Sequence, residues 1–441
     1  MTEHYTDTIV AIATAPGRGG VGVVRLSGPE SAQIAEQICG KLAQTRQAKF
    51  THFRAADKEI IDSGIALYFA GPASFTGEDV IELQGHGSPL VMARLCQRAV
   101  ELGARMARPG EFSERAFLNG KMDLAQAEAV ADLIESSTEL AARSAMRSLQ
   151  GEFSKKVNDF LQELTYLRMF IDFLGEAQVD KQLQQLLATL AGIQGSARQG
   201  RLLREGISVV LAGQPNAGKS SLHNRLAGHD AAIVTEVAGT TRDVLREQIH
   251  LGGLPLRISD TAGLHDATSD IVELEGIRRT QNELAQADHI LLLIDDQLGM
   301  TEQDTKILSA LPSDKSFTLI RNKIDQSGHA AEITIENGMS VIYLSAKNGE
   351  GMDLLTQHLC EVVGFHPEEE GVFMARRRHL DALQRAQQAI EAGYDCLTGM
   401  GAGELLAEEL RIAQSALGEI TGTFTTEDLL DRIFSSFCIG K

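Results

Sequence analysis

One segment, ISVVLAGQPNAGKSSLHNRLAG at residues 207–228, limits the possible folds of this chain more than any other. Its β-rich start leads into Gly213-x4-Gly218-Lys219-Ser220, and a helical pattern follows. This is a phosphate-binding loop in its strand–loop–helix context, in which glycines let backbone N–H groups point at phosphate oxygens. Lys219 is expected to reach the β- and γ-phosphates, and the Ser220 hydroxyl to bind Mg²⁺. The segment therefore predicts a nucleoside triphosphate site.

Two motifs further along are typical of segments that surround a γ-phosphate. Thr240 and Thr241 lie in AGTTRD, where one of them is placed to complete the Mg²⁺ shell. Asp260-Thr261-Ala262-Gly263 follows the strand-like LPLRIS. Its aspartate is expected to hold Mg²⁺ through water, and the Gly263 N–H to contact the γ-phosphate.

Two more motifs are suited to reading the base. In Asn322-Lys323-Ile324-Asp325 the carboxylate can accept from both N1–H and the 2-amino group of guanine, a donor pair that adenine lacks. Asn322 is expected to brace the loop and the base edge. In Ser345-Ala346-Lys347 a backbone N–H can meet the guanine O6. Five motifs in this order indicate a GTPase.

The sequence departs from many small GTPases at the position that orients the attacking water. Leu264 stands where a glutamine often follows DxxG, and its side chain can neither donate nor accept. Another group must then orient water and offset charge in the transition state. The candidates for water are acids of the following loop, and those for charge are Arg242 or a cation held by the loop itself. The acids are Asp266, Asp270, Glu273 and Glu275. The alternative is a slow GTPase that serves as a timer.

The residue composition and pattern of the chain change three times along its length. Short β-rich runs with Gly/Pro turns indicate an α+β domain at 1–120, and helical composition follows over 121–205. A β-rich stretch with glycines occupies 206–365, and helices return over 366–441. Because the last stretch is too small to form a core alone, we expect one helical domain built from both flanks, with the middle domain inserted into it.

Composition excludes several classes of protein. Apolar residues make up 43% and charged residues 23%, which argues against disorder. With 41 basic and 60 acidic residues the net charge is −19, which argues against coating nucleic acid or anionic lipid by bulk charge. Scattered cysteines without CxxC, a polar N-terminus and no run of 18 apolar residues predict a soluble cytosolic protein. The cysteines are Cys39, Cys96, Cys360, Cys396 and Cys438.

Several motifs together resemble the MnmE (TrmE) family of tRNA-modifying GTPases over nearly the whole chain. They are GRGGVGVVRLSG, SFTGEDVIELQGHG, RPGEFSERAFLNGKMDLAQAEA, GQPNAGKSSL, AGTTRDV and the terminal FCIGK. The resemblance implies an α/β and α multidomain protein. An N-terminal α+β domain (1–120) would bind tetrahydrofolate and dimerise, and a helical domain (121–205 plus 366–441) would carry an inserted Ras-like P-loop GTPase domain (206–365). The segment 168–182 is shorter and less acidic than is typical of the family's helical arm: either the arm is shortened or residues are missing from the chain.

The resemblance also implies which residues hold nucleotide and ions. The family uses K⁺ as the missing positive charge, with Asn216, Thr235, Val237 and Thr240 as the matching ligands. Its water-orienting acid aligns best with Glu273, and Glu275 is the alternative. The residues that match the nucleotide and ion site are Asn216, Ala217, Gly218, Lys219, Ser220, Ser221, Thr235, Glu236, Val237, Ala238, Gly239, Thr240, Thr241, Asp260, Thr261, Ala262, Gly263, Asn322, Lys323, Ile324, Asp325, Ser345, Ala346 and Lys347.

A second set of matches lies outside the GTPase motifs. Arg25, Glu82, Lys121 and Lys441 match the family's contacts to a tetrahydrofolate derivative, either 5-formyl- or methylene-tetrahydrofolate. Without the resemblance each would be interpreted as a solvated surface charge. Cys438 matches a functional cysteine near the modification site, although a lone cysteine in SSFCIG is otherwise a small buried hydrophobe.

The implied function is a homodimeric GTPase acting with a flavin-dependent partner, MnmG, on the wobble uridine of tRNA. FAD would belong to the partner, since this chain has no GxGxxG motif. Two other functions stay open: a ribosome-assembly GTPase, and a GTP-driven switch that only assembles or releases partners. The three arginines at 376–378 are expected to be a solvated helix start, with a tRNA contact as the alternative.

Overall fold

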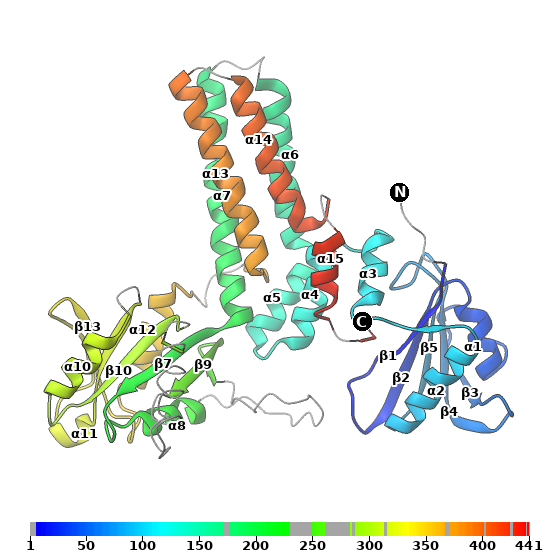
Figure 1. Ribbon diagram of the computed structural model, residues 1–441, viewed down its shortest axis with the longest axis horizontal. Helices are drawn as coiled ribbons and strands as arrows, with labels where there is room; N and C mark the ends of the chain where they lie inside the picture. The colour runs from blue at the N-terminus through cyan, green and yellow to red at the C-terminus, as the bar shows by residue number, and fades with distance from the viewer. Residues whose placement is uncertain are drawn as a thin grey trace, which may run out of the picture.

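Two β-sheets and a bundle of long helices make up the computed structural model (Figure 1). It describes residues 6–171, 176–229, 249–260, 283–284, 287–312, 315–366, 371–400, 403–423, 427–437 and 439–440. The mixed α/β and helical fold class that we expected is confirmed. The ranges that we assigned to the three domains stay a prediction.

The first sheet has six strands in the order β3-β4-β5-β2-β1-β6. Its strands are β1 (Ile9–Ile12), β2 (Gly19–Ser27), β3 (Lys49–Arg54), β4 (Ile60–Phe69), β5 (Val80–Gly87) and β6 (Arg105–Met106). All neighbours are antiparallel except β1 and β6. Helices α1 (Ser31–Cys39) and α2 (Pro89–Glu101) contribute their apolar residues to the same core as alternate residues of the strands. The strand residues that alternate with these core residues, including Arg25 and Glu82, lie outside that core. The guanidinium of Arg25 lies over the ring of Phe112 in α3 (Glu111–Leu118).

The second sheet has seven strands in the order β12-β13-β11-β10-β7-β9-β8. They are β7 (Ile207–Gly213), β8 (Ile249–Leu251), β9 (Leu254–Asp260), β10 (His289–Asp295), β11 (Phe317–Asn322), β12 (Glu332–Glu336) and β13 (Met339–Leu344). At the two edges, β8 pairs antiparallel with β9, and β12 pairs antiparallel with β13. All other pairs are parallel. Apolar runs such as HILLLID suit strands buried on both faces. The carboxyl ends of these parallel strands gather the loops that carry the motifs.

Four helices surround the α/β sheet on the described part of the chain. They are α8 (Lys219–His229), α10 (Glu302–Ala310), the short α11 (Ile324–Ser327) and α12 (Met352–Val363).

The helical part is assembled from two stretches that are distant in sequence. Its helices are α4 (Leu124–Glu135), α5 (Glu139–Leu149), α6 (Glu152–Phe170), α7 (Glu176–Glu205), α13 (Arg377–Met400), α14 (Gly403–Thr421) and α15 (Glu427–Phe434). One apolar core joins α6 and α7 to α13 and α14, which stand side by side in Figure 1. At its base Phe153 stacks on Phe373, with ring centroids 4.4 Å apart.

Buried ion pairs also join the two stretches. Arg378 donates to both carboxylate oxygens of Glu128 (2.8 and 2.6 Å), and Arg376 donates to Asp132 (2.8 Å), which Arg204 also contacts (2.8 Å). Glu128 is 1% exposed and Asp132 is 5% exposed. Our expectation of a solvated helix start is therefore wrong for Arg376 and Arg378, because α4 covers them with two acids.

The C-terminal segment returns to the N-terminal part of the chain. Phe434 and Phe437 share an apolar cluster with Leu124 of α4, and α15 contacts α3. A Cβ added to Gly440 would lie 2.3 Å from the carbonyl oxygen of Ile12, so the chain end lies against β1. Among the described helices none is both long and apolar enough to cross a membrane.

Candidate nucleotide and cofactor sites

The phosphate-binding loop connects β7 to α8, as its motif predicts. Gly213 and Gly218 have φ of 140° and 99°, in the left-handed region. A Cβ would lie 2.3 Å from the Leu293 carbonyl oxygen at Gly213, and 2.1 Å from Asn322 Nδ2 at Gly218. Both positions therefore require glycine, for conformation and for space.

Lys219 is held inside the loop. Its Nζ donates to the carbonyl oxygens of Gly213 (2.8 Å) and Gln214 (2.9 Å), and the residue is 5% exposed. These bonds keep the ammonium at the mouth of the loop, where a β- or γ-phosphate binds. Ser220 follows in the first turn of α8 and is exposed.

Asn216 is an exposed polar residue of this loop whose side chain can coordinate a cation. It adopts φ 67°, which asparagine tolerates better than most residues. An amide oxygen in this position is a suitable ligand for a hard monovalent or divalent cation.

The base-reading loops are joined to the phosphate-binding loop by Asn322. Its Nδ2 donates to the Ala217 carbonyl (2.8 Å), and its Oδ1 accepts from the Ala346 N–H (3.0 Å). Asn322 is 2% exposed, so these bonds replace water that burial removes. Asp325 Oδ1 accepts from Ser345 Oγ (2.7 Å), which brings the two base-reading motifs together.

Asp295, Arg225 and Thr301 belong to none of the motifs and support these loops. Lys323 adopts φ 74° and its Nζ lies 2.7 Å from Asp295 Oδ2 at the end of β10. Arg225 of α8 donates through Nε to the Ala346 carbonyl (3.0 Å). Gln214 Nε2 donates to Thr301 Oγ1 at the start of α10 (2.7 Å). Sequence analysis missed Asp295, Thr301 and Arg225. Of the three, only Asp295 could have been found, because it ends the apolar run of β10.

The predicted site residues at 235–242 and 261–275 lie outside the described residues. Asp260 ends β9 beside Leu211 of β7, which puts its backbone next to the phosphate-binding loop. Its side chain lies outside the described residues. So do the remaining residues expected to bind nucleotide or potassium, to orient water or to offset charge: Thr235, Glu236, Val237, Ala238, Gly239, Thr240, Thr241, Arg242, Thr261, Ala262, Gly263, Asp266, Asp270, Glu273 and Glu275. Their roles stay predictions.

The first sheet carries the second candidate site. Arg25 and Glu82 are direct neighbours on β2 and β5, and Arg25 donates to Glu82 Oε1 through Nε (3.0 Å) and Nη2 (2.8 Å). The guanidinium carbon lies 5.6 Å from the ring centre of Phe75 and 5.8 Å from that of Phe112. A charged pair beside two aromatic rings can hold a flat, polar ligand.

The other two residues predicted for this site lie at its margins. Lys121 Nζ donates to the Pro72 carbonyl (2.8 Å), on the loop that also supplies Phe75. Lys441 and Cys438 lie outside the described residues. Gly440 lies against Ile12, which pairs with Val24, the residue before Arg25.

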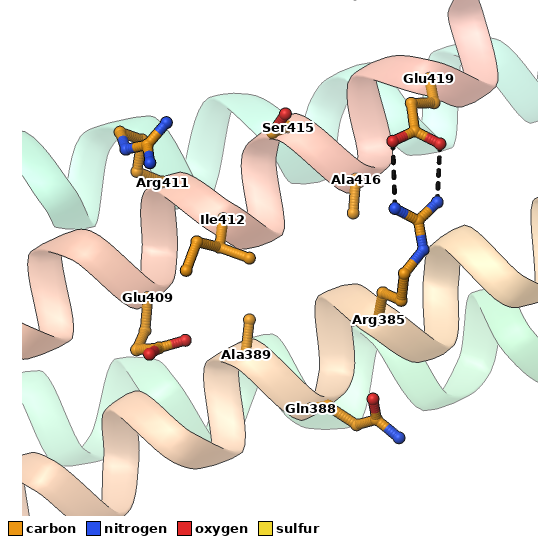
Figure 2. Close-up of a pocket in the computed structure, with 9 residues that line it drawn as sticks. All are labelled: Arg385, Gln388, Ala389, Glu409, Arg411, Ile412, Ser415, Ala416 and Glu419. Carbon is orange, nitrogen blue, oxygen red and sulfur yellow. Dashed lines mark hydrogen bonds and ion pairs between the residues drawn. The ribbon is translucent and has the colours of Figure 1, made fainter.

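A groove on the helical bundle contains none of the predicted site residues. It encloses about 450 Å³ and is lined by residues of α13 and α14, as Figure 2 shows. Arg385 donates to both oxygens of Glu419 beside it (3.0 and 2.6 Å), and these bonds raise the pKa of Arg385. Arg411, which also lines the groove, donates to both oxygens of Glu408 (2.9 and 2.7 Å). Because both arginine charges are matched, the groove lacks the chemistry of a phosphate site.

Comparison with known proteins covers the whole chain. The family model for the MnmE helical domain matches residues 124–438, and that for the GTP-binding protein TrmE N-terminus matches residues 8–121. The tRNA modification GTPase MnmE of Nitrosococcus oceani is 57% identical over 451 residues, covering 100% of this chain and 98% of that protein. The protein of the same name from Proteus mirabilis is 54% identical over 456 residues, covering 99% and 100%.

A solved structure, a variant of Aquifex aeolicus Era bound to GDP.AlF4-, is 26% identical with a TM-score of 0.27, covering 42% of this chain and 66% of that one. The full-length identity and the two family models lead to one conclusion: this chain belongs to the MnmE family of tRNA modification GTPases.

Proposed function

We propose that this chain is a potassium-dependent GTP hydrolase that modifies tRNA together with a flavin-dependent partner, MnmG. The pair would add an aminomethyl or carboxymethylaminomethyl group at C5 of the wobble uridine, U34, with a tetrahydrofolate derivative as the one-carbon donor. One observation carries the proposal. A nucleotide cradle and a charged, aromatic site on a separate sheet occur in one chain whose full length matches tRNA modification GTPases.

The nucleotide part of the proposal rests on the loops at the ends of β7, β11 and β13. Lys219 would bind the phosphates, and Asp325 would accept from the guanine edge while Ser345 fixes its carboxylate. Ser220 and Thr241, with Asp260 through water, would hold Mg²⁺. Bound Mg²⁺ would supply positive charge to the phosphates during hydrolysis. The exposed Ser220 hydroxyl at the start of α8 fits that task.

Hydrolysis would depend on K⁺ to offset charge in the transition state, and on a separate acid to orient water, since Leu264 cannot do so. Asn216 would supply a side-chain oxygen to the ion, together with Thr235, Val237 and Thr240. Bound K⁺ supplies positive charge near the phosphates, where other GTPases use an arginine. The exposed amide and left-handed backbone of Asn216 support this assignment. Glu273 would orient the attacking water, with Glu275 as the alternative.

The folate part of the proposal rests on Arg25 and Glu82. A pterin ring is flat and carries both donors and acceptors, so an ion pair beside Phe75 and Phe112 suits it. The carrier supplies a one-carbon unit. Lys121 and Lys441 are cations suited to its glutamate tail, and Gly440 brings the chain end to β1. We include Cys438 in the site without assigning it a chemical role.

The assembly that we propose is a homodimer joined to MnmG in a heterotetramer or larger complex, acting on tRNA in the cytoplasm. The net charge of −19 supports a tRNA contact that is local or supplied by the partner, rather than one spread over the surface. The ion pairs of Arg376 and Arg378 with α4 also remove those arginines from the candidates for such a contact.

The test is the content of modified wobble uridine in cells that lack this chain, measured by mass spectrometry of tRNA nucleosides. We expect the modification to disappear, to return with the wild-type chain, and not to return with Lys219→Ala or Arg25→Ala. Arg94→Ala is the matched control, because Arg94 forms an exposed ion pair with Glu59 on the same domain. Unchanged nucleosides in the deletion would reject the proposal and favour an assembly switch.

A further inference from the structure

We propose that Arg225 is a positioning residue that fixes the base-reading loop at 345–347 to the phosphate-binding helix α8. The residue belongs to none of the nucleotide motifs. This inference rests on the proposed guanine site and adds a determinant of how tightly and how long that site holds the base.

The contacts of Arg225 reach two successive carbonyl groups of the loop. Its Nε donates to the Ala346 oxygen (3.0 Å), and its Nη2 donates to the Lys347 oxygen. The guanidinium also covers the turn that closes the loop, because a Cβ added to Gly349 would lie 3.7 Å from its Cζ. Two bonds from one planar, charged group fix both the position and the tilt of the loop.

Asn322 and Asp325 hold the same loop from its opposite side. Asn322 accepts from the Ala346 N–H (3.0 Å), and Ser345 Oγ donates to Asp325 (2.7 Å) while accepting from the Asn348 N–H (3.2 Å). Ser345 is 0% exposed and Ala346 is 2% exposed. A buried carbonyl that loses its donor destabilises the conformation that buries it. Arg225 therefore holds the carbonyl side of the loop, and Asn322 the amide side.

Space for the loop to relax lies directly beside this contact. A cavity of about 280 Å³ is lined by Ser221, Asn224, Arg225, Gly228 and Ala346. Truncating Arg225 would leave the loop free to shift into it. The backbone N–H of the 345–347 loop that is expected to meet the guanine O6 would then move away from the base.

The position of Arg225 on α8 links the two ends of the nucleotide. Lys219 begins α8 and Arg225 lies six residues later, a rise of about 9 Å along one rigid helix. The group that binds phosphate and the group that positions the base-reading loop therefore belong to one body. Loss of Arg225 should loosen the base without disturbing the phosphate-binding loop.

The experiment measures dissociation of nucleoside diphosphates from the full chain by stopped-flow fluorescence with ribose-labelled nucleotides. Arg225→Ala should raise the GDP dissociation rate about 10-fold, and Arg225→Lys should give an intermediate rate because an ammonium can still donate. With the diphosphate of 2-aminopurine riboside, which lacks O6 and N1–H, the effect of Arg225→Ala should fall below about 2-fold. Asn224→Ala, on the same turn and exposed, should change neither rate.

The outcomes separate this inference from the function on which it rests. If Arg225→Ala accelerates release of both nucleotides equally, or of neither, while the wild type prefers GDP to ADP, Arg225 does not act through the base. If the wild type shows no preference for GDP over ADP, the proposed guanine site itself is wrong. Equal midpoints of thermal unfolding for the wild type and Arg225→Ala would show that the variant is folded.

Discussion

At the scale of single residues, the proposed choice of guanine would depend on one carboxylate, that of Asp325, which a neighbouring hydroxyl orients. Asp325→Asn would remove the group proposed to accept two guanine hydrogens, and Ser345 Oγ (2.7 Å from Asp325) could not replace it. We expect GTP binding to weaken by about 2–4 kcal/mol, with partial rescue by a xanthine nucleotide. Isothermal titration with both nucleotides measures this. Unchanged GTP affinity would remove Asp325 from the base site.

A second residue-scale prediction concerns the ion. Hydrolysis should be faster in K⁺ than in Na⁺, and Asn216→Ala should abolish most of that difference because one oxygen ligand is lost. Nucleotide binding should change little, since Lys219 and Asn322 hold their places without Asn216. Phosphate release at matched ionic strength in KCl and NaCl measures the response. Equal turnover of the wild type in both salts would contradict the potassium mechanism.

Residues of the phosphate-binding and base-reading motifs could be predicted because their roles need fixed local spacing around a ligand. The glycines at 213 and 218 follow from backbone geometry alone, and the structure places them as expected. Arg378 could not be predicted, because its partner Glu128 lies 250 residues away and no local pattern connects them. The role of Arg225 could not be predicted for a similar reason, since its partners lie 121 and 122 residues further along the chain.

At the scale of elements, the contact between α4 and α13 makes stability depend on pH. Burial opposes ionisation of Glu128, but the His379 and Arg378 side chains outweigh it and hold the pKa of Glu128 well below its usual range. Burial, with Arg378 close by, lowers the pKa of His379 to about 4. His379 Nδ1 accepts from the Arg376 N–H (3.1 Å), which requires the neutral ring.

The lowered pKa values of Glu128 and His379 both make the folded chain less stable as the pH falls. An unfolded chain protonates His379 below about pH 6.5 whereas the folded chain does not, so this contribution is complete above 6.5 and is lost as the pH falls toward 4. His379→Gln should reduce the pH slope of the unfolding free energy in that window by up to about 1.4 kcal/mol per unit. Urea unfolding followed by circular dichroism measures it. His52→Gln, at an exposed histidine whose ring contacts the neutral hydroxyl of Ser63, is the control measured in the same way.

Elements differ in how well their sequences predict them. The strands β7 and β10 are apolar runs bounded by glycine or aspartate, and α8 follows from its motif, so all three could be predicted. The two-residue β6 carries no pattern of its own and exists because it pairs with β1. That the helices on both flanks form one unit was expected from their size, whereas the ion pairs that join them depend on tertiary contacts.

At the scale of the whole molecule, a loop proposed to hold K⁺ in place of an arginine finger leads us to predict that two nucleotide domains face each other during hydrolysis. Each would shield the ion and order the other's loop at 235–241, so that the ion's field acts at lower dielectric. Spin labels on Ile335→Cys, an exposed position on β12, should approach in K⁺ with GDP and aluminium fluoride, but not in Na⁺ or with GDP alone. Distances that do not respond to the mimic would mean that the acid acts within one subunit.

The divided bundle has a consequence for how the protein is made. Ribosomes release α6 and α7 about 170 residues before the start of α13, a delay of roughly 10–30 s at ordinary rates of synthesis. During that time Leu164, Leu183 and Leu190 lack the cover that α13 and α14 later provide. The strands and helices of the inserted nucleotide domain are synthesised in the same interval. The core of the helical bundle can therefore be completed only after the inserted domain has been synthesised and the C-terminal helices have emerged.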